Sequence, residues 1–544
     1  MKTSIFRIGF PIGGLNEAAP YNAQPPNTTV KAKNVRAWDV SQGRIRGGQR
    51  PGLKKFLSTQ LNTTAQIQDL LTVVTTGTAT LSLTSLSNRT VAGYGVAGGT
   101  IKKFDTTGWT ATTAGSGALS STAPLIFSAE FFGKIYYADG VSAKFVTIST
   151  DTAAAWTASA GSLPAASAEK PRLIERWRGR IVQSGIRTDP HNWFMSAVED
   201  ATNWNYSPTV ITETQAVAGG SSILGKCGDK INSMIPYSDD VLIFLCDHSI
   251  VQMSGDPMSG GRMDVITDIT GGAYGRPWAI DSQGRIYFVG SRGGVFRMTP
   301  GAGMERLTTG LIDERLANVD MNRVIFRLAW SEVEQGLYVY ASPLIDQNSF
   351  ALFFDDATKS WWLDEFTTGT HYPRSIAVYD GDDPEDRTFL LGCGDGYVRQ
   401  VMRESLNDDG VAIDSYVYLG PIKSPKGGLD TFVLSEVECV LGVQSDDVDY
   451  VVYAGDDAEN ALDDNAGARL LGVLDEDGGY FIIEETPTNQ GSYRGTFPAG
   501  RSTTKRPRVR GDAMYVKLGN DDLGERWEME WLQCTLAIPS DAKP

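Results

Sequence analysis

The sequence has few of the residues from which metal sites and nucleophilic sites are usually built. Its 544 residues include five cysteines and three histidines, and no two cysteines form a CxxC pair. A zinc site built from cysteine and histidine is therefore not expected. The scattered cysteines indicate buried, reduced thiols in a chain that folds in cytoplasm. A GxSxG signature and a glycine-rich phosphate loop are also missing, so no local motif favours an enzyme.

Long hydrophobic runs and excess positive charge are missing too. No stretch reaches the roughly 18 apolar residues that a membrane-spanning helix needs, and the first 26 residues contain no continuous apolar core. We therefore expect neither a signal peptide nor a membrane anchor. Lys and Arg number 49 against 65 Asp and Glu, which gives a net charge of −16. A field of this sign argues against simple electrostatic binding of free duplex DNA or of an anionic membrane.

Glycine is abundant, at 59 residues, and it separates short runs of β-branched and aromatic side chains. One pattern recurs: a turn, a short strand of large apolar residues, and a small or acidic turn. Each copy is preceded and followed by another short strand, so each repeat predicts a three- or four-stranded antiparallel meander. The copies are GKIYYADG (133–140), GRIVQSG (179–185), DVLIFLCD (240–247), GRIYFVGS (284–291), GLYVYAS (336–342) and RTFLLGCGDG (387–396).

The spacing of these copies predicts the fold class. Their turns lie 44 to 61 residues apart, and a propeller blade takes about 40–50 residues. We predict an all-β protein with a β-propeller of six or seven blades over residues 57–411. An open sandwich or a β-solenoid is the alternative. A weaker copy at 77–85 would belong to an earlier blade. The low-complexity stretches 107–122 and 149–170 are expected to be loops, and a short helix is expected within 311–322.

The two ends of the chain differ from the repeats. Residues 412–544 hold longer strands of alternating character and predict a C-terminal β-sandwich domain. Residues 1–56 are rich in Pro, Asn and Gly and predict an extended N-terminal arm. Within the arm, residues 31–55 carry eight basic residues and one acidic residue. This basic segment is either a solvated face or a contact with an acidic neighbouring subunit. Its members are Lys31, Lys33, Arg36, Arg44, Arg46, Arg50, Lys54 and Lys55.

Acidic residues gather at several predicted turns, where local hydrogen bonding favours Asp. Asp382 and Asp383 belong to the segment DGDDPED, and Asp446 and Asp447 belong to QSDDVDY. A glycoside hydrolase needs two carboxylates about 5–10 Å apart in a cleft. A calcium loop needs the regular DxDxDG spacing, which DGDDPED lacks. We therefore predict no catalytic residue, no metal site and no cofactor.

Several stretches of the chain resemble one protein family. These stretches cover about residues 10–260, and the C-terminal RVRGDAMYVKLGNDD and WEMEWLQCTLAI are similar in style. The family is the tail nozzle, or tail tubular protein B-like, group of short-tailed bacteriophages. The segments that carry the resemblance are GGLNEAAPYNAQPPNTTVKAKNVRAWDVSQGRIRGGQRPGLKKF, ERWRGRIVQSGIRTDPHNWFMSAVEDATNWNY and INSMIPYSDDVLIFLCDHSIVQMSGDP.

The resemblance implies a structural virion protein of the phage tail, made and assembled in the host cytoplasm, and not an enzyme. Six copies would form a homo-hexameric ring whose central channel seals the tail and conducts genomic DNA during ejection without sequence-specific binding. The ring would dock onto the tail adaptor or tail tubular protein and support tail fibres or spikes. Six copies would carry a charge of about −96, and a negative lumen repels the phosphate backbone.

On this view the acidic turns at Asp382, Asp383, Asp446 and Asp447 face the lumen or a subunit interface, an expectation that rests on charge clustering. Two other functions remain open from the sequence. One is a carbohydrate-binding or hydrolytic β-propeller that acts as a phage receptor-binding protein. The other is a bacterial propeller scaffold without a virion role. Glycan binding would identify the first, and a monomer present without any phage particle would identify the second.

Overall fold

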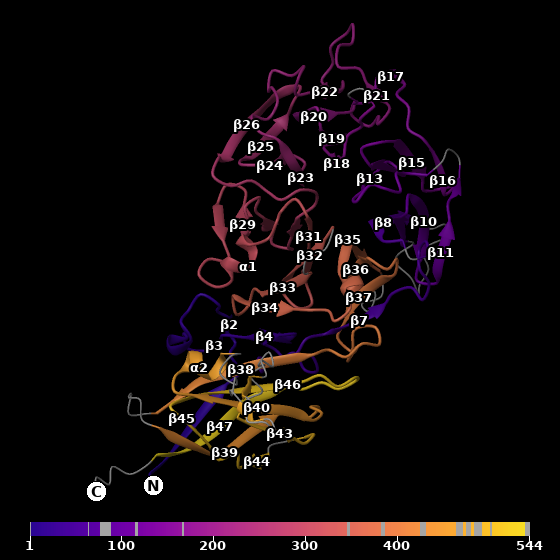
Figure 1. Cartoon of the computed structure of the whole chain (residues 1–544). Coiled ribbons are helices and arrows are strands. Elements are labelled where there is room, and N and C mark those ends of the chain that lie inside the picture. The colour runs from indigo at the N-terminus through magenta and orange to yellow at the C-terminus, as the bar shows by residue number, and fades with distance from the viewer. Residues whose placement is uncertain are drawn as a thin grey trace, which may run out of the picture.

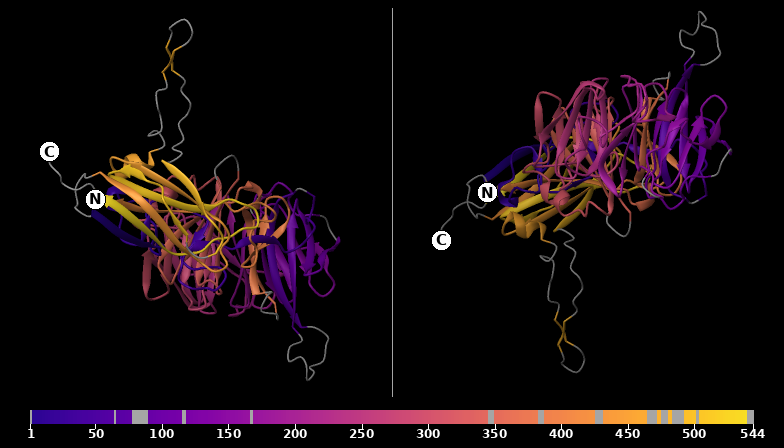
Figure 2. Two further views of the ribbon diagram at one scale, coloured as in Figure 1. Left: turned by 90° about the horizontal axis from the view of Figure 1, so that it is seen from below. Right: turned by 90° about the horizontal axis from the view of Figure 1, so that it is seen from above.

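The structure is a computed structural model of the whole chain. It describes residues 2–63, 65–76, 89–114, 118–165, 168–344, 349–381, 387–424, 431–463, 472–474, 480–482, 492–500 and 503–538. Figure 1 shows a ring of small sheets in the upper part of the view and a two-sheet sandwich below it. The views in Figure 2 show the two bodies side by side, with the N-terminus at the sandwich end. The all-β fold with a propeller and a C-terminal sandwich is thus confirmed.

The propeller has seven blades among the described residues, each a four-stranded antiparallel arrangement. The first strands of successive blades lie side by side around the propeller axis for every neighbouring pair except blades 4 and 5, and the first strand of blade 7 lies against that of blade 1. Blade 1 consists of β8 (Ile67–Thr76), β9 (Arg89–Ala97), β10 (Thr100–Asp105) and β11 (Gly108–Ala111), and blade 2 of β13 (Phe127–Phe131), β14 (Lys134–Ala138), β15 (Ala143–Thr147) and β16 (Thr152–Ala155). Blade 3 consists of β18 (Leu173–Trp177), β19 (Arg180–Ile186), β20 (Asp189–Met195) and β22 (Val217–Ala218), blade 4 of β23 (Ile231–Ser238), β24 (Val241–Cys246), β25 (Ile250–Asp256) and β26 (Ser259–Thr267), and blade 5 of β27 (Trp278–Ile280), β28 (Ile286–Val289), β29 (Val295–Thr299) and β30 (Gly303–Arg306). Blade 6 consists of β31 (Val324–Ser331), β32 (Gly336–Pro343), β33 (Phe350–Asp355) and β34 (Ser360–Asp364), and blade 7 of β35 (Pro373–Asp380), β36 (Arg387–Cys393), β37 (Val398–Met402) and β7 (Gly52–Lys55).

The six recurring segments are the second strands of blades 2 to 7, namely β14, β19, β24, β28, β32 and β36. In β24, for example, Leu242 and its next three neighbours are all 0% exposed. A second strand is buried on both faces because neighbouring blades pack against it. It therefore reads as a continuous apolar run instead of an alternating one. The weaker copy at 77–85 lies outside the described residues.

The low-complexity stretches are not simply loops, as the sequence suggested. The first supplies β11, the outer strand of blade 1, and the second supplies β16, the fourth strand of blade 2, which a two-residue strand from the first stretch flanks at the rim. An outer strand lies at the rim with one side toward solvent, so Thr and Ala suffice there once a preceding strand provides hydrogen-bond partners. The short helix expected within 311–322 is present as α1 (Asp313–Ala317).

The sandwich consists of two sheets with an apolar core between them. The helix α2 (Ala458–Leu462) packs against β40. One sheet contains β1 (Lys2–Gly9), β47 (Met529–Ile538), β39 (Phe432–Leu441), β44 (Thr503–Lys505) and β45 (Val509–Gly511). The other contains β4 (Ala32–Lys33), β38 (Ser415–Lys423), β46 (Ala513–Asn520), β40 (Val448–Gly455) and β43 (Tyr493–Phe497).

The first 56 residues are extended, as expected, but they do not form a unit of their own. β1 pairs with β47 at one edge of the sandwich, and β4 pairs with β38 in the other sheet. β7 then pairs with β37 and completes blade 7. The domain division at residue 56 is therefore corrected: the arm belongs partly to the sandwich and partly to the propeller, and its indigo trace passes between them in Figure 1.

The remaining elements are short. None of the described helices is long and apolar enough to cross a membrane. The elements are the pairs β2 (Gly14–Leu15) with β3 (Thr28–Thr29), β5 (Val35–Arg36) with β6 (Gly48–Gln49), β17 (Ala160–Gly161) with β21 (Asn203–Trp204) and β41 (Gly472–Leu474) with β42 (Tyr480–Ile482), the strand β12 (Thr113–Ala114) beside β16, and the 3-10 turns η1 (Tyr21–Ala23) and η2 (Gly369–His371).

The closure of blade 7 by β7 predicts a strong dependence of stability on one arm residue. Leu53 of β7 is 1% exposed, whereas its neighbour Lys54 is exposed. Leu53→Ala should lower the free energy of unfolding by about 2–4 kcal/mol, because it leaves a cavity where the ring closes. Lys54→Ala on the same strand should change it by less than about 0.5 kcal/mol. Urea denaturation of both variants measures this, and equal effects would contradict closure by β7.

Candidate functional site

The basic segment of the arm lies at the junction of the two domains, where Arg36 is fully buried. Its two terminal nitrogens each lie 2.7 Å from a different carboxylate oxygen of Asp364, the last residue of β34. Its guanidinium also lies 4.0 Å from the ring centre of Phe353. Burial acts to lower the pKa of Arg36, but Asp364 outweighs this effect and raises the pKa above its ordinary value. Arg36 therefore stays charged and ties the arm to blade 6.

Arg50 makes a second buried ion pair, with Asp408 in the connection between propeller and sandwich. Its terminal nitrogens lie 2.9 and 2.5 Å from the two carboxylate oxygens, and its Nε donates to the side-chain oxygen of Asn34 at 2.8 Å. The Asn34 amide donates to the carbonyls of Glu365, 3.1 Å away, and Asp414, 2.8 Å away. Asn34, whose φ is 56°, thus joins the arm, blade 6 and the start of the sandwich.

Three further cations of the segment have partners within the chain. Arg46 contacts Asp39 at 2.6 Å and Glu528 at 3.1 Å. The other two pairs are Lys33 with Asp414 at 2.6 Å and Lys55 with Asp409 at 3.4 Å.

The expected inter-subunit role of the basic segment is therefore corrected for its buried members. Arg36, Arg46 and Arg50 are at most 8% exposed, so a neighbouring subunit cannot reach them. Their charges are used to join the two domains of one chain. Lys31 is half-buried, and Arg44 and Lys54 are exposed, so these three stay available to a neighbour.

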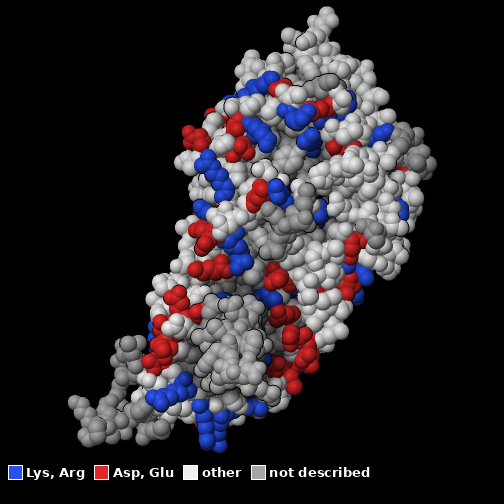
Figure 3. Space-filling model, viewed as in Figure 1, with Lys and Arg blue, Asp and Glu red and all other residues white. Residues whose placement is uncertain are grey.

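The predicted acidic turns fall in different places. Asp382 and Asp383 lie outside the described residues. Asp446 and Asp447 form the turn between β39 and β40, where their carboxylates accept hydrogen bonds from the backbone N–H groups of Arg526 at 3.0 Å and Ala499 at 2.5 Å. They stabilise neighbouring loops of the sandwich, and their position at a lumen or interface stays a prediction. In Figure 3 acidic side chains gather along one margin of the sandwich, whereas both signs alternate over the propeller.

A second group of buried charges fills the propeller axis, and the sequence analysis missed it. Arg276, before β27, donates to Glu175 of β18 at 2.6 Å and to the carbonyl of Ser128 in β13 at 2.6 Å. The hydroxyl of Ser128 donates to the carboxylate of Asp69 in β8. These bonds connect blade 5 with blades 1, 2 and 3 across the axis.

Arg327 of β31 enters the same space from blade 6 and donates to the carbonyl of Arg374 at 2.9 Å. Its guanidinium and that of Arg276 lie 5.4 and 5.5 Å from the ring centre of Phe127. Side chains thus occupy the axis itself. The signal that could have revealed this group is a charged residue inside an otherwise apolar first strand, such as Glu175 in LIERW and Arg327 in VIFRLAW.

The pKa values of this group reflect its burial. Burial raises the pKa of Asp69 to about 6, although Arg276, Ser128 and Arg327 act in the opposite direction. Burial, assisted by the charge of Arg276, lowers the pKa of Arg327 to about 10. Burial also raises the pKa of Glu175. Opposite charges therefore do not offset desolvation at Asp69, Glu175 and Arg327. At Arg276, the charges of Glu175 and Asp69 outweigh it, and the pKa of this arginine is raised.

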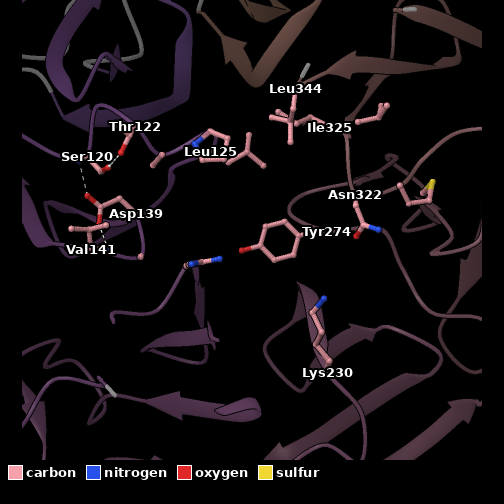
Figure 4. A pocket seen from close by; sticks show the side chains of 16 residues that line it. Ser120, Thr122, Leu125, Asp139, Val141, Lys230, Tyr274, Asn322, Ile325 and Leu344 are labelled. Carbon is pink, nitrogen blue, oxygen red and sulfur yellow. Dashed lines mark hydrogen bonds between the residues drawn. The ribbon is translucent and has the colours of Figure 1, made fainter. Parts of the chain in front are cut away.

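Above this group lies a cavity of about 390 Å³, at the end of the axis where the first strands begin (Figure 4). It is lined mainly by residues that stand one to seven positions before the first strands of blades 2 to 6, by the start of β31 and by the turn between β14 and β15. Among the described residues, no set of three or more His, Cys, Asp or Glu could hold a metal. The polar and charged lining residues are Ser120, Thr122, Asp139, Arg172, Lys230, Tyr274 and Asn322.

Replacing the buried Arg36 should lower the free energy of unfolding far more than replacing the exposed Arg176. Arg36→Met removes the bidentate partner of Asp364 and leaves this buried carboxylate with Arg50 alone, 3.9 Å away, so the free energy of unfolding should fall by about 3–5 kcal/mol. Arg176 is 59% exposed and pairs with Glu130 at the surface, so Arg176→Met should cost less than about 1 kcal/mol. Chemical denaturation measures both values. A small effect of Arg36→Met would contradict its structural role.

Asp69 predicts a defined pH dependence of stability. The folded pKa is raised from 3.8 to about 6, so between these values the folded state binds a proton that the unfolded state has lost. Stability due to this group is therefore highest below about pH 4 and falls as the pH rises through about 6, by roughly 3 kcal/mol in all.

Asp69→Asn should remove this fall between about pH 4.5 and about pH 7.5. Asp105→Asn, at an exposed acid whose pKa is lowered by hydrogen bonds from Thr107, should keep the pH profile of the parent chain over the same range. Urea unfolding at the two pH values measures the difference. An unchanged pH profile in Asp69→Asn would show that another group is responsible.

No protein-family model matches the chain, and no curated protein matches it. Among solved structures, the extracellular domain of the hybrid two-component system BT4673 from B. thetaiotaomicron is 10% identical over 71% of the chain, with a TM-score of 0.37. A second structure of BT4673, there called a one-component system, is 10% identical over 91% of the chain and 63% of its own length, with a TM-score of 0.40. The N-terminal domain of Nup159 is 9% identical over 64% of the chain and 95% of its own length, with a TM-score of 0.38. The chain spans 43% of the first of these structures. The strand pairing of the chain itself defines its fold.

Proposed function

We propose that the chain is a structural virion protein that forms the distal tail nozzle of a short-tailed phage. Six copies form a ring whose acidic central channel seals the tail and conducts DNA during ejection. The resemblance described from the sequence supports this proposal. The structural observation that carries it is the presence of two different strand edges, both unpaired among the described residues, at opposite ends of one rigid chain.

The first edge is β26, the outer strand of blade 4. Its nine residues have no strand partner on the outer side among the described residues. Val265 is 64% exposed and Ile266 is 39% exposed, and Ile269 just beyond the strand is 78% exposed. A long free edge with exposed apolar side chains promotes pairing with another chain unless a partner covers it. This edge therefore suits a contact surface in an assembly.

The second edge is β1, at the other end of the molecule in Figure 1. β1 is the terminal strand of its sheet, and its Ile5 and Phe6 are 63% and 38% exposed. Two different surfaces on one chain permit head-to-tail contacts, which close into a ring when the rotation between copies allows it. Identical self-complementary patches would instead favour a twofold dimer.

The filled propeller axis constrains where DNA can pass. Arg276 and Arg327 occupy the axis of each propeller, so that axis is not a conduit. In the proposed ring the channel therefore lies between copies. The buried ion pairs of the arm hold propeller and sandwich together within each copy, which suits a ring that must resist the pressure of packaged DNA.

Cryo-electron microscopy of the particle that carries this chain, reconstructed without imposed symmetry, tests the proposal directly. Six copies around the distal end of a tail are expected. Three copies at the periphery of the particle, or none in the particle, would contradict the nozzle assignment.

A pair of variants tests the contact at β26. Val265→Asp should reduce incorporation into particles at least about tenfold, because a charge is placed at an apolar contact. Val333→Asp is the matched control, since Val333 is 61% exposed in the turn after β31. Both variants should unfold at the parent temperature. Equal incorporation of both would argue against β26 as a contact.

A further inference from the structure

The cavity at the mouth of the propeller axis contains two positive charges without a negative partner in the described structure. Arg172 stands directly before β18 and Lys230 directly before β23, so they occupy equivalent positions in neighbouring blades. Neither side chain has an ion pair or hydrogen bond to another described residue. Since the chain as a whole carries −16, a cavity lined by two cations and one acid is a local exception.

The one acid in the lining, Asp139, has its hydrogen bonds from neutral groups and leaves the two cations in excess. The carboxylate of Asp139 accepts four hydrogen bonds, from the backbone N–H groups of Ser120 and Val141 at 2.8 Å and from the N–H and hydroxyl of Ser142 at 2.6 Å each. It holds the β14–β15 turn against the loop before β13, as the dashed lines in Figure 4 show in part. Its oxygens are thus engaged, and the guanidinium and ammonium groups stay open to a ligand.

Neutral polar groups face the same space. In Figure 4 the side chains of Tyr274, Lys230 and Asn322 lie around one opening, opposite Ser120 and Thr122. Burial raises the pKa of Tyr274 to about 12, against the opposing effect of Arg172. Its hydroxyl therefore keeps its proton and can donate at neutral pH. Arg, Lys and several hydroxyl or amide groups together match an anion that also carries hydroxyls.

The volume of the cavity fits a small molecule. Its volume of about 390 Å³ lies within the range of small-molecule sites, roughly 300–1,000 Å³. The side chains of Arg276 and Glu175 fill the propeller axis, so the cavity does not continue along that axis as a channel. A ligand enters from the face of the propeller and stops above the axial group.

We infer that this cavity binds a hydroxylated small anion, a sugar that carries a carboxylate or a phosphate, with Arg172 and Lys230 holding the anionic group and Tyr274 and Asn322 contacting hydroxyls. The inference does not depend on the nozzle proposal, because it concerns a single chain. The ligand has two chemical sources: an acidic unit of a surface glycan or a free sugar phosphate.

Isothermal titration of the full chain with glucuronate, glucose 6-phosphate and glucose tests the inference. Binding of one or both anions, with no binding of glucose, is expected. Glucuronate alone indicates a glycan unit, and glucose 6-phosphate alone indicates a free sugar phosphate. If neither anion binds at millimolar concentration, or if glucose binds as tightly as the anions, the inference is wrong.

Three variants locate the bound anion. Arg172→Gln and Lys230→Gln should each weaken binding about tenfold or more, because each removes a charge-assisted contact. Lys54→Gln is the matched control, since Lys54 is exposed on β7, outside the cavity lining. It should leave the affinity unchanged. Equal weakening by all three variants would show general attraction to positive charge and overturn the assignment. Circular dichroism verifies that each variant is folded.

Discussion

Two buried guanidiniums hold the propeller and the sandwich in one structure. A charge at Arg36 or Arg50 cannot be buried without a partner, and the available partners, Asp364 and Asp408, belong to the last strand of blade 6 and to the connection after blade 7. The arm must therefore pass between the domains in one register. That register delivers β7 to the edge of β37, so the closure of the ring follows from where the arginines are neutralised.

The apolar contacts and the ion pairs at this junction have different roles. Phe10 of the arm packs against Trp362 of β34 and Trp527 of the sandwich, with ring centres 5.6 and 6.4 Å away. Burial of such large rings supplies most of the favourable free energy. Buried ion pairs contribute little net stability, because desolvation opposes their attraction. Their contribution is to penalise every other register, since a shift would leave an unpaired charge in the interior.

The sequence predicted the parts of the fold that carry a local pattern. Strands such as β24 read as apolar runs because two blades bury them, and the sandwich strands alternate because one face meets its core. It did not predict the course of the arm, because the partners of Arg36 lie more than 300 residues away and a dense basic segment looks like a solvated surface. The axial group was missed for a related reason. Asp69, Glu175 and Arg327 lie in three separate strands, and only the closed ring brings them together.

The ion pairs inside the chain also determine where its net negative charge lies. The buried cations of the arm are neutralised by Asp364, Asp408 and Glu528 inside the chain, and Arg276 is matched by Glu175 in the axis. These pairs contribute nothing to the total, so the charge of −16 resides mainly on the outside. In the proposed ring, any part of this negative exterior that lines the channel would repel the phosphate backbone and let DNA slide. The cationic cavity, at about 390 Å³, is too small to admit the DNA duplex and has room only for a small anion.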